Sequence, residues 1–155
     1  MRFGIAILLL VLSFSSVGQV QLFKGDSNFN SDIAYTIENG LVYHGDPGFS
    51  RLVLFTLSDN KVYHGQSTMA FDCLYTIKGN KVYHGDSNFS SDIVYTIEDG
   101  KVYRGNSTFS TNCVLTFEED KIFMGDSTFP TDQLFTVAGM GEVGIAFLAC
   151  IVGPY

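Results

Sequence analysis

The chain has 155 residues, of which 46% are hydrophobic and 16% are charged, so it has enough material for one domain with one core. Its formal net charge of −7 repels phosphate backbones, which argues against nucleic acid as a partner. Three cysteines are too few for a disulfide scaffold, and an aromatic content of 14% argues against disorder. The composition therefore predicts a compact, turn-rich β protein.

Residues 1–18 have the pattern of a secretory signal peptide. Arg2 provides a positive charge, residues 3–14 form an apolar run, and small residues at 16–18 offer a cleavage site before Gln19. An uncleaved membrane anchor is the alternative, but the apolar run is shorter than the roughly 18–20 residues that span a bilayer. We therefore expect a secreted or cell-surface protein whose mature form has no membrane span.

Residues 19–140 form the predicted β domain, because six repeats follow one another there with a strict 20-residue period. The repeats occupy 21–40, 41–60, 61–80, 81–100, 101–120 and 121–140. Two positions never vary. The invariant glycines are Gly25, Gly45, Gly65, Gly85, Gly105 and Gly125, and the invariant threonines are Thr36, Thr56, Thr76, Thr96, Thr116 and Thr136. A fixed period of this length indicates units that bury their apolar faces mainly against their neighbours.

Each repeat contains two predicted strands that form a hairpin. In the fourth repeat, Ile93, Tyr95 and Ile97 alternate with residues of the opposite face, which is the period-2 pattern of a half-buried strand. The Asp-Gly pair at 99–100 tolerates positive φ and predicts a type I′ turn into a second strand at 101–104. This pairing places the apolar set on one face and the threonine and tyrosine columns on the other.

A linker of the form Gly-Asp-Ser-X-Phe follows the second strand. The invariant glycine predicts a backbone bend with positive φ, so we assign the six glycines to structural turns. The Asp and Ser favour turns that their side chains stabilise. The large apolar side chains that end the linkers are expected to fill the core between repeats. They are Phe29, Phe49, Met69, Phe89, Phe109 and Phe129.

Residues 141–155 leave the repeat pattern and are strongly apolar, with Glu142 as their one charged residue. We expect this segment to cap the open end of the repeat stack. A membrane-inserting or partner-binding tail is the alternative, although the segment is too short to span a bilayer.

The repeats predict an all-β fold, namely an open β-solenoid of six 20-residue repeats, built as stacked hairpins or as parallel β-helix coils, with a C-terminal apolar cap. A closed ring of two-stranded blades and a trefoil of six hairpins are the alternatives. A trefoil should show a 40-residue sub-period, of which Cys73 and Cys113 are the one hint. These two cysteines are expected to be small buried hydrophobes in an inward column. The distinct C-terminal segment favours an open stack, which has ends to protect.

The layout of residues 21–140, with hairpin repeats, aromatic residues and an Asp-Gly turn, resembles the choline-binding and related cell-wall-binding repeats of Gram-positive surface proteins. The Gly-Trp signature of those repeats is missing, because the chain has no Trp. The resemblance therefore implies no ligand and no site residue for this chain.

No pattern in the chain predicts catalysis, metal binding or a cofactor. The histidines His44, His64 and His84 occupy one repeat position, whereas an active site is normally a single asymmetric cluster. Columns of Asp residues could hold Ca²⁺ between repeats, but uncharged residues interrupt them, and we interpret each Asp as a turn cap. We therefore expect a protein that is not an enzyme and has no metal and no cofactor.

The expected function is binding or assembly through a regular exposed surface. The residues predicted to face a ligand or partner are the six invariant threonines together with Tyr43, Tyr63, Tyr83 and Tyr103. A cell-surface or extracellular glycan or protein is the expected partner, because tyrosine rings stack on sugars at a low cost in entropy. Homo-assembly into fibres through exposed strand edges is the alternative. A calcium-binding solenoid, an ice-binding protein and a hydrolase are minor alternatives.

Overall fold

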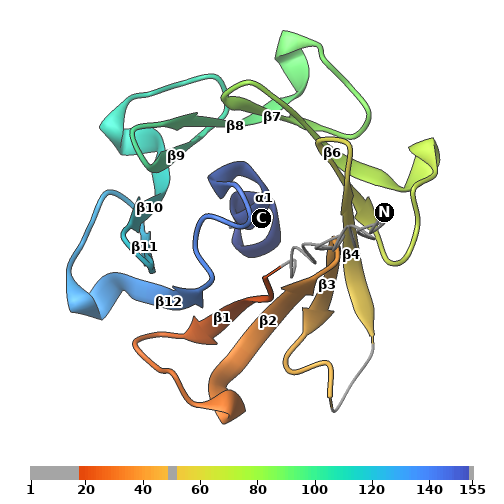
Figure 1. Cartoon of the computed structure of the whole chain (residues 1–155). Coiled ribbons are helices and arrows are strands. Elements are labelled where there is room, and N and C mark those ends of the chain that lie inside the picture. Colours follow the sequence, from red (N-terminus) through yellow and green to blue (C-terminus); the bar gives the residue numbers. More distant parts are fainter. Residues whose placement is uncertain (1–17, 49–51, 154–155) are drawn as a thin grey trace, which may run out of the picture.

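The computed structural model describes residues 18–48 and 52–153, and in this part of the chain twelve strands form one closed antiparallel barrel (Figure 1). Residues 1–17 of the predicted signal peptide and Phe49 lie outside the described residues. The strands are β1 (Val20–Lys24), β2 (Ile33–Glu38), β3 (Leu41–His44), β4 (Val53–Ser58), β5 (Lys61–His64), β6 (Cys73–Lys78), β7 (Lys81–His84), β8 (Ile93–Glu98), β9 (Lys101–Arg104), β10 (Cys113–Glu118), β11 (Lys121–Met124) and β12 (Gln133–Ala138). Short 3-10 turns precede five of the longer strands, at Asn30–Asp32, Ala70–Asp72, Ser90–Asp92, Ser110–Asn112 and Pro130–Asp132.

The predicted all-β repeat fold is confirmed, but the open solenoid is wrong. Strand β1 pairs with β12, so the first and last strands meet and the sheet closes. The closed ring that we held as an alternative is nearer, although the strands form one continuous sheet instead of separate blades. Each described strand has a neighbour on both sides, so the strand edges expected to join copies into a fibre are already paired within the chain.

Two-residue turns connect the strands within each hairpin, as the sequence predicts. In the second repeat, Asp59 and Asn60 have φ values of 49° and 59°. Both central residues of a type I′ turn need positive φ, and this turn matches the right-handed twist of the strands that it joins. The repeated turn therefore produces five similar hairpins that stand side by side around a ring.

The ring is closed by a hairpin whose two strands come from opposite ends of the domain. Strand β1 follows the predicted leader, whereas β12 belongs to the last repeat. The Gly25 N–H donates to the Leu134 carbonyl at 2.8 Å, as the Gly45 N–H donates to the Ala34 carbonyl at 2.8 Å in the hairpin of β2 and β3. The sequence repeats and the structural hairpins are therefore out of phase, and this offset ties the two ends of the domain together.

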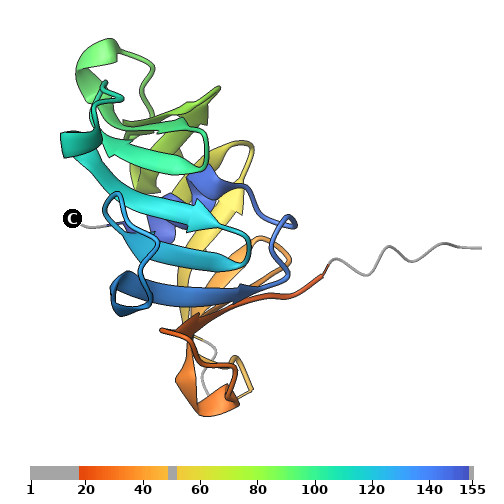
Figure 2. The same ribbon diagram turned by 90° about the vertical axis from the view of Figure 1, so that its left-hand side faces the viewer.

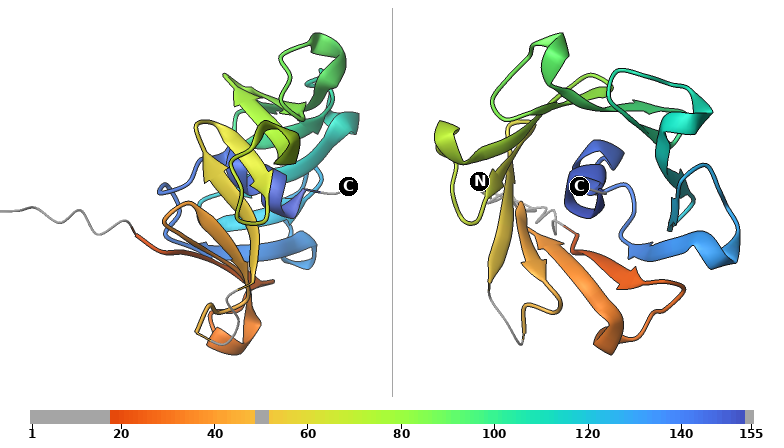
Figure 3. Two further views of the ribbon diagram at one scale, coloured as in Figure 1. Left: turned by 90° about the vertical axis from the view of Figure 1, so that its right-hand side faces the viewer. Right: turned by 180° about the vertical axis from the view of Figure 1, so that it is seen from behind.

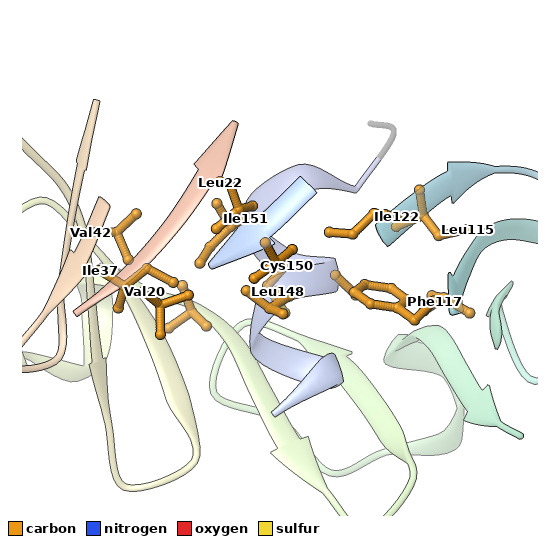
Figure 4. Close-up of a cluster of buried hydrophobic side chains, with 14 of the residues drawn as sticks. Val20, Leu22, Ile37, Val42, Leu115, Phe117, Ile122, Leu148, Cys150 and Ile151 are labelled. Carbon is orange, nitrogen blue, oxygen red and sulfur yellow. The ribbon is translucent and has the colours of Figure 1, made fainter. Parts of the chain in front are cut away.

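The interior of the barrel holds the helix α1 (Ile145–Val152), which passes through its middle (Figure 1). Leu148 and Ile151 lie between Leu22 on one wall and Ile122 and Phe117 on the other (Figure 4). The exposed fraction of the Leu148 side chain is 0%. The C-terminal segment thus fills the barrel and does not cover an open end. In the described part of the chain, no helix has both the length and the apolar character needed to cross a membrane.

A β-bulge near the start of each longer strand changes which residues face inward. In β6, Tyr75 pairs with Val62 and Cys73 pairs with Tyr63, so Leu74 is the extra residue. Cys73 therefore lies on the outer side with the threonine column, and its Sγ is 3.8 Å from the Thr76 Oγ1. The expected inward column is wrong at this position for both Cys73 and Cys113, because a period-2 pattern does not reveal a bulge. Both thiols are free.

The linkers form loops that point toward one end of the barrel, and the hairpin turns point toward the other end (Figures 2 and 3). The expected filling of the core by linker side chains is wrong. The exposed fractions are 70% for Phe29, 60% for Met69, 70% for Phe89, 75% for Phe109 and 71% for Phe129. The interior is already filled by α1, and hydrogen bonds within each loop hold these side chains outward.

Candidate functional site

The invariant glycine and threonine of each repeat form one hydrogen-bonded unit. The six glycines have φ values between 58° and 70°. Each glycine carbonyl accepts a hydrogen bond from a threonine Oγ1 at 2.7–2.8 Å, including the bond from Thr136 to Gly25 that crosses the ring closure. This threonine–glycine latch fixes the bend where each short strand passes into its loop.

The latch explains why several threonines cannot contact a ligand. The exposed fractions are 0% for Thr36, 2% for Thr96 and 5% for Thr116. The expectation of an exposed threonine column is therefore wrong for these three residues. The hydroxyl of a buried threonine needs a partner, and the glycine carbonyl supplies it.

The tyrosine column is also less exposed than the strand pattern suggests. Tyr63 is 7% exposed and Tyr103 is 9% exposed, so the expected contact surface is wrong for these two. Tyr43 and Tyr83 are half-buried, and Tyr43 lines a groove on the outside of the barrel.

Hydrogen bonds within the loop give each linker a fixed shape. In the first repeat, the Ser27 Oγ donates to the Asp32 carboxylate at 2.6 Å, and the Phe29 N–H donates to the Ser27 Oγ at 3.2 Å. The same bonds recur at Ser67 and Ser127. In the fifth repeat, Asn112 replaces the Asp and donates to Ser107 instead, at 2.7 Å. The loops are therefore built to hold their apolar tips in solvent.

A second set of polar contacts ties four of the hairpins to the loop of the next one. The Lys61 Nζ lies 2.8 Å from the Asp86 carboxylate, and the hydrogen bond to Asp86 raises the pKa of the Lys61 ammonium. The Lys101 Nζ lies 2.5 Å from the Asp126 carboxylate. Equivalent contacts join Lys81 to Asn106 at 2.6 Å and, across the ring closure, Lys121 to Asp26 at 3.7 Å.

This pairing shows the role of most of the Asp residues that follow the invariant glycines, and the sequence contained a signal for it that we missed. These residues are Asp26, Asp46, Asp86 and Asp126. Lys and its Asp or Asn partner are always 25 residues apart, or fall at the equivalent positions across the closure. The turn-capping interpretation fits Asp46, whose Oδ1 accepts a hydrogen bond from the Gly48 N–H at 2.9 Å. Asp86 and Asp126 instead form ion pairs with lysines of the preceding hairpin.

Three grooves on the outside of the barrel occupy equivalent places in different repeats. Each lies between the end of a longer strand and the loop that follows ten residues later. The paired walls are Glu38 with Gly48, Lys78 with Asn88, and Glu118 with Thr128. The groove volumes are about 190, 300 and 320 Å³ in that order. The repeat thus produces a repeated concave surface, which the sequence pattern alone did not indicate.

The lining of the grooves combines charged groups with aromatic rings. The groove of Lys78 also contains Asp86 and the exposed ring of Phe89. The groove of Glu118 contains Phe123 and the ion-paired Lys121 and Asp26. The groove of Lys78 can therefore offer both hydrogen-bonding groups and an exposed ring face to one ligand.

The three histidines lie away from these grooves, at the end of the barrel that carries the loops. His44, His64 and His84 are exposed and share their repeat position with Lys24, Arg104 and Met124. The Tyr35 and His44 rings make an edge contact with centroids 6.4 Å apart. Within the described residues, no group of three or more His, Cys, Asp or Glu side chains is placed to hold a metal ion.

A comparison with protein families gives a match over residues 22–150, from β1 into α1, to a family model described as a 6-fold beta flower protein. The matched range includes the helix as well as the repeats. No curated protein and no solved structure is significantly similar to the chain.

Proposed function

The chain belongs to the 6-fold beta flower protein family, and from this premise we propose that it is a secreted or cell-surface, non-enzymatic module that binds glycans through the grooves on the outside of the barrel. The observation that carries the proposal is the recurrence of one groove at equivalent positions of three repeats. A single catalytic centre would be expected to break the repeat pattern, whereas a binding surface gains from repetition.

The chemistry of the grooves suits neutral sugars. Sugar hydroxyls donate and accept hydrogen bonds, and the groove of Lys78 offers an ammonium group beside the Asp86 carboxylate and the Asn88 amide. The Phe89 side chain is 70% exposed, so its ring face is open to the C–H groups of a pyranose. The mixed charges of this lining favour a neutral polar ligand over a strongly charged one.

Repetition around the ring provides multivalency. A glycan-coated surface presents many copies of a sugar, and several weak sites on one rigid body raise the overall avidity by a factor of about 10²–10⁴ when they engage together. A groove of about 300 Å³ is at the lower limit of the range of ligand pockets, so each site is expected to hold one or two sugar units weakly.

Glycan arrays probed with the purified chain and with groove variants test this proposal. Phe89→Ala removes the exposed ring that lines the groove of Lys78, and retention on the bound glycans should fall at least tenfold. The Phe89 side chain is 70% exposed, so its removal leaves the core intact. Tyr63→Ala is unsuitable, because Tyr63 is buried and its truncation would disturb packing.

Phe71→Ala is the matched control. Phe71 is 82% exposed and lies in a loop of the same type, but it does not line these grooves. This variant should bind as the unmodified chain does. The proposal is wrong if no glycan is retained, or if Phe89→Ala and the control bind equally well.

A further inference from the structure

A fourth pocket, separate from the outer grooves, lies at the end of the barrel where the short strands pass into their loops. It has a volume of about 350 Å³ and lies between β7 and β9. Its polar lining consists of His84, Arg104, Tyr75 and Tyr95, and none of the lining residues that the structure describes is acidic. A described lining with a guanidinium and an imidazole and without Asp or Glu stands out in a chain whose formal net charge is −7.

The strand register explains how these side chains meet. Tyr75 pairs with His84 across β6 and β7, and Tyr95 pairs with Arg104 across β8 and β9. Directly paired residues project to the same face of a sheet, so the two pairs stand side by side on neighbouring hairpins. Among the described residues, no carboxylate forms an ion pair with Arg104.

We propose that this pocket binds the oxyanion group of a small ligand, that is, a carboxylate, sulfate or phosphate. The Arg104 guanidinium has a planar fork of N–H donors that fits two oxygens of such a group. The His84 imidazole adds a further N–H donor. The two tyrosine rings and the backbone near Gly105 form the walls, so the pocket has room for the body of a ligand about the size of a monosaccharide.

The pairing of an arginine with a histidine in this pocket occurs once in the ring, because the residue equivalent to Arg104 differs between repeats. The neighbouring hairpin on one side has the uncharged Met124 at this position, and the hairpin on the other side has His84. At this repeat position, a guanidinium and an imidazole therefore occur on neighbouring hairpins only at Arg104 and His84. The inference does not depend on the glycan proposal, because the pocket shares no lining residue with the outer grooves.

A competing explanation is that these cations stabilise the end of α1. A side chain on Gly153, just after the helix, would lie 2.6 Å from the Tyr95 hydroxyl, so the helix ends close to this pocket. The C-terminal end of a helix carries a partial negative charge, which nearby cations offset. The two explanations differ in whether Arg104 contributes to the affinity of the chain for an added anion.

An NMR titration of the full ¹⁵N-labelled chain with sodium sulfate, at an ionic strength held constant with NaCl, distinguishes them. The proposal predicts saturable shifts of the amide signals of Tyr95 and Gly105. Arg104→Met, which copies the residue at the same position of the sixth repeat, should weaken sulfate binding at least tenfold, as expected for the loss of a charge-assisted hydrogen bond. Lys24→Met is the control, because it removes a cation from the same repeat position on another strand. The sulfate affinity of this variant should stay within about twofold of that of the unmodified chain.

Titrations with glucuronate and glucose show which oxyanion the pocket accepts and whether the charge is required. Glucuronate should compete with sulfate, and glucose should not. The proposal is overturned if the sulfate shifts do not saturate, or if Arg104→Met binds sulfate as the unmodified chain does. If Arg104→Met lowers the melting temperature and leaves the sulfate affinity unchanged, the cations serve the helix end and the proposed site does not exist.

Discussion

Within a single repeat, the two invariant residues serve one mechanical purpose. The glycine takes a positive φ that L-residues with side chains seldom adopt, and the threonine hydroxyl bonds the carbonyl of that glycine. Sequence periodicity identified both residues, but it assigned the threonine to a ligand-facing surface. At Thr36, Thr96 and Thr116 the assignment failed because an alternating strand pattern shows which face a residue occupies and does not show what covers that face.

The latch can be tested at Thr36, whose side chain is fully buried and whose Oγ1 lies 2.7 Å from the Gly45 carbonyl oxygen. Thr36→Val keeps the shape of the side chain and leaves that carbonyl without its partner. The free energy of unfolding should fall by about 1–3 kcal/mol, as measured by urea denaturation. Thr111→Val, at an exposed loop position, should change it by less than about 0.5 kcal/mol. Equal effects of the two variants would show that the hydrogen bond does not stabilise the bend.

Among the elements, α1 is the one that the repeat does not encode. Six hairpins enclose an interior lined by small and medium apolar side chains such as Val42, Val62 and Val82, each at most 1% exposed. These side chains alone would leave the middle of a twelve-strand barrel open, because the diameter of a barrel grows with the number of its strands. The apolar helix occupies that space, which explains why a strongly apolar segment follows the last repeat.

The burial of α1 predicts a dependence of stability on pH through Cys150. Desolvation inside the barrel raises the pKa of the Cys150 thiol from 9.0 to about 12. Between these pH values the unfolded chain loses the thiol proton and the folded chain keeps it. The unfolded state then binds fewer protons, so stability is unaffected below about pH 9 and falls as the pH rises toward 12, with a limiting slope of about 1.4 kcal/mol per pH unit.

Cys150→Ala removes this contribution and leaves all other titrating groups in place. Urea denaturation of both proteins at pH 8, 9.5 and 10.5 measures the difference. The variant should be less stable at pH 8, because a small cavity replaces the thiol, and the difference should shrink as the pH rises. A constant difference across this pH range would mean that Cys150 is not desolvated and that α1 does not fill the barrel.

For the whole molecule, the sequence predicted the repeat unit well and its assembly poorly. The hairpins, the turns at Asp59-Asn60 and the bend glycines could be read from the chain, because local propensity and periodicity determine them. Closure could not, because it depends on the tilt and twist accumulated over twelve strands. The outer grooves were missed for a different reason. Their walls lie ten residues apart, on a hairpin and the loop that follows it, and the strand pattern does not show how that loop folds back.

Closure also defines which surfaces are available for function. A ring without free strand edges presents its loops, its outer grooves and its two ends to solvent, and these are the places where the proposed sites lie. The glycan proposal and the oxyanion proposal both require that neighbouring hairpins keep fixed positions. The pairing of β1 with β12 is the contact that holds the ring in that state.

A disulfide trap between β1 and β12 tests the closed ring most directly. Gln21 and Ala138 are direct partners across these strands, and in an open stack they would lie at opposite ends of the domain. Gln21→Cys with Ala138→Cys is made in a chain whose own cysteines are replaced by Cys73→Val, Cys113→Ile and Cys150→Ala, the first two copied from other repeats. Mild oxidation followed by non-reducing mass spectrometry of peptides should find one intramolecular disulfide joining residues 21 and 138 in nearly all molecules. Free thiols, or disulfides that join two chains, would contradict the closed ring.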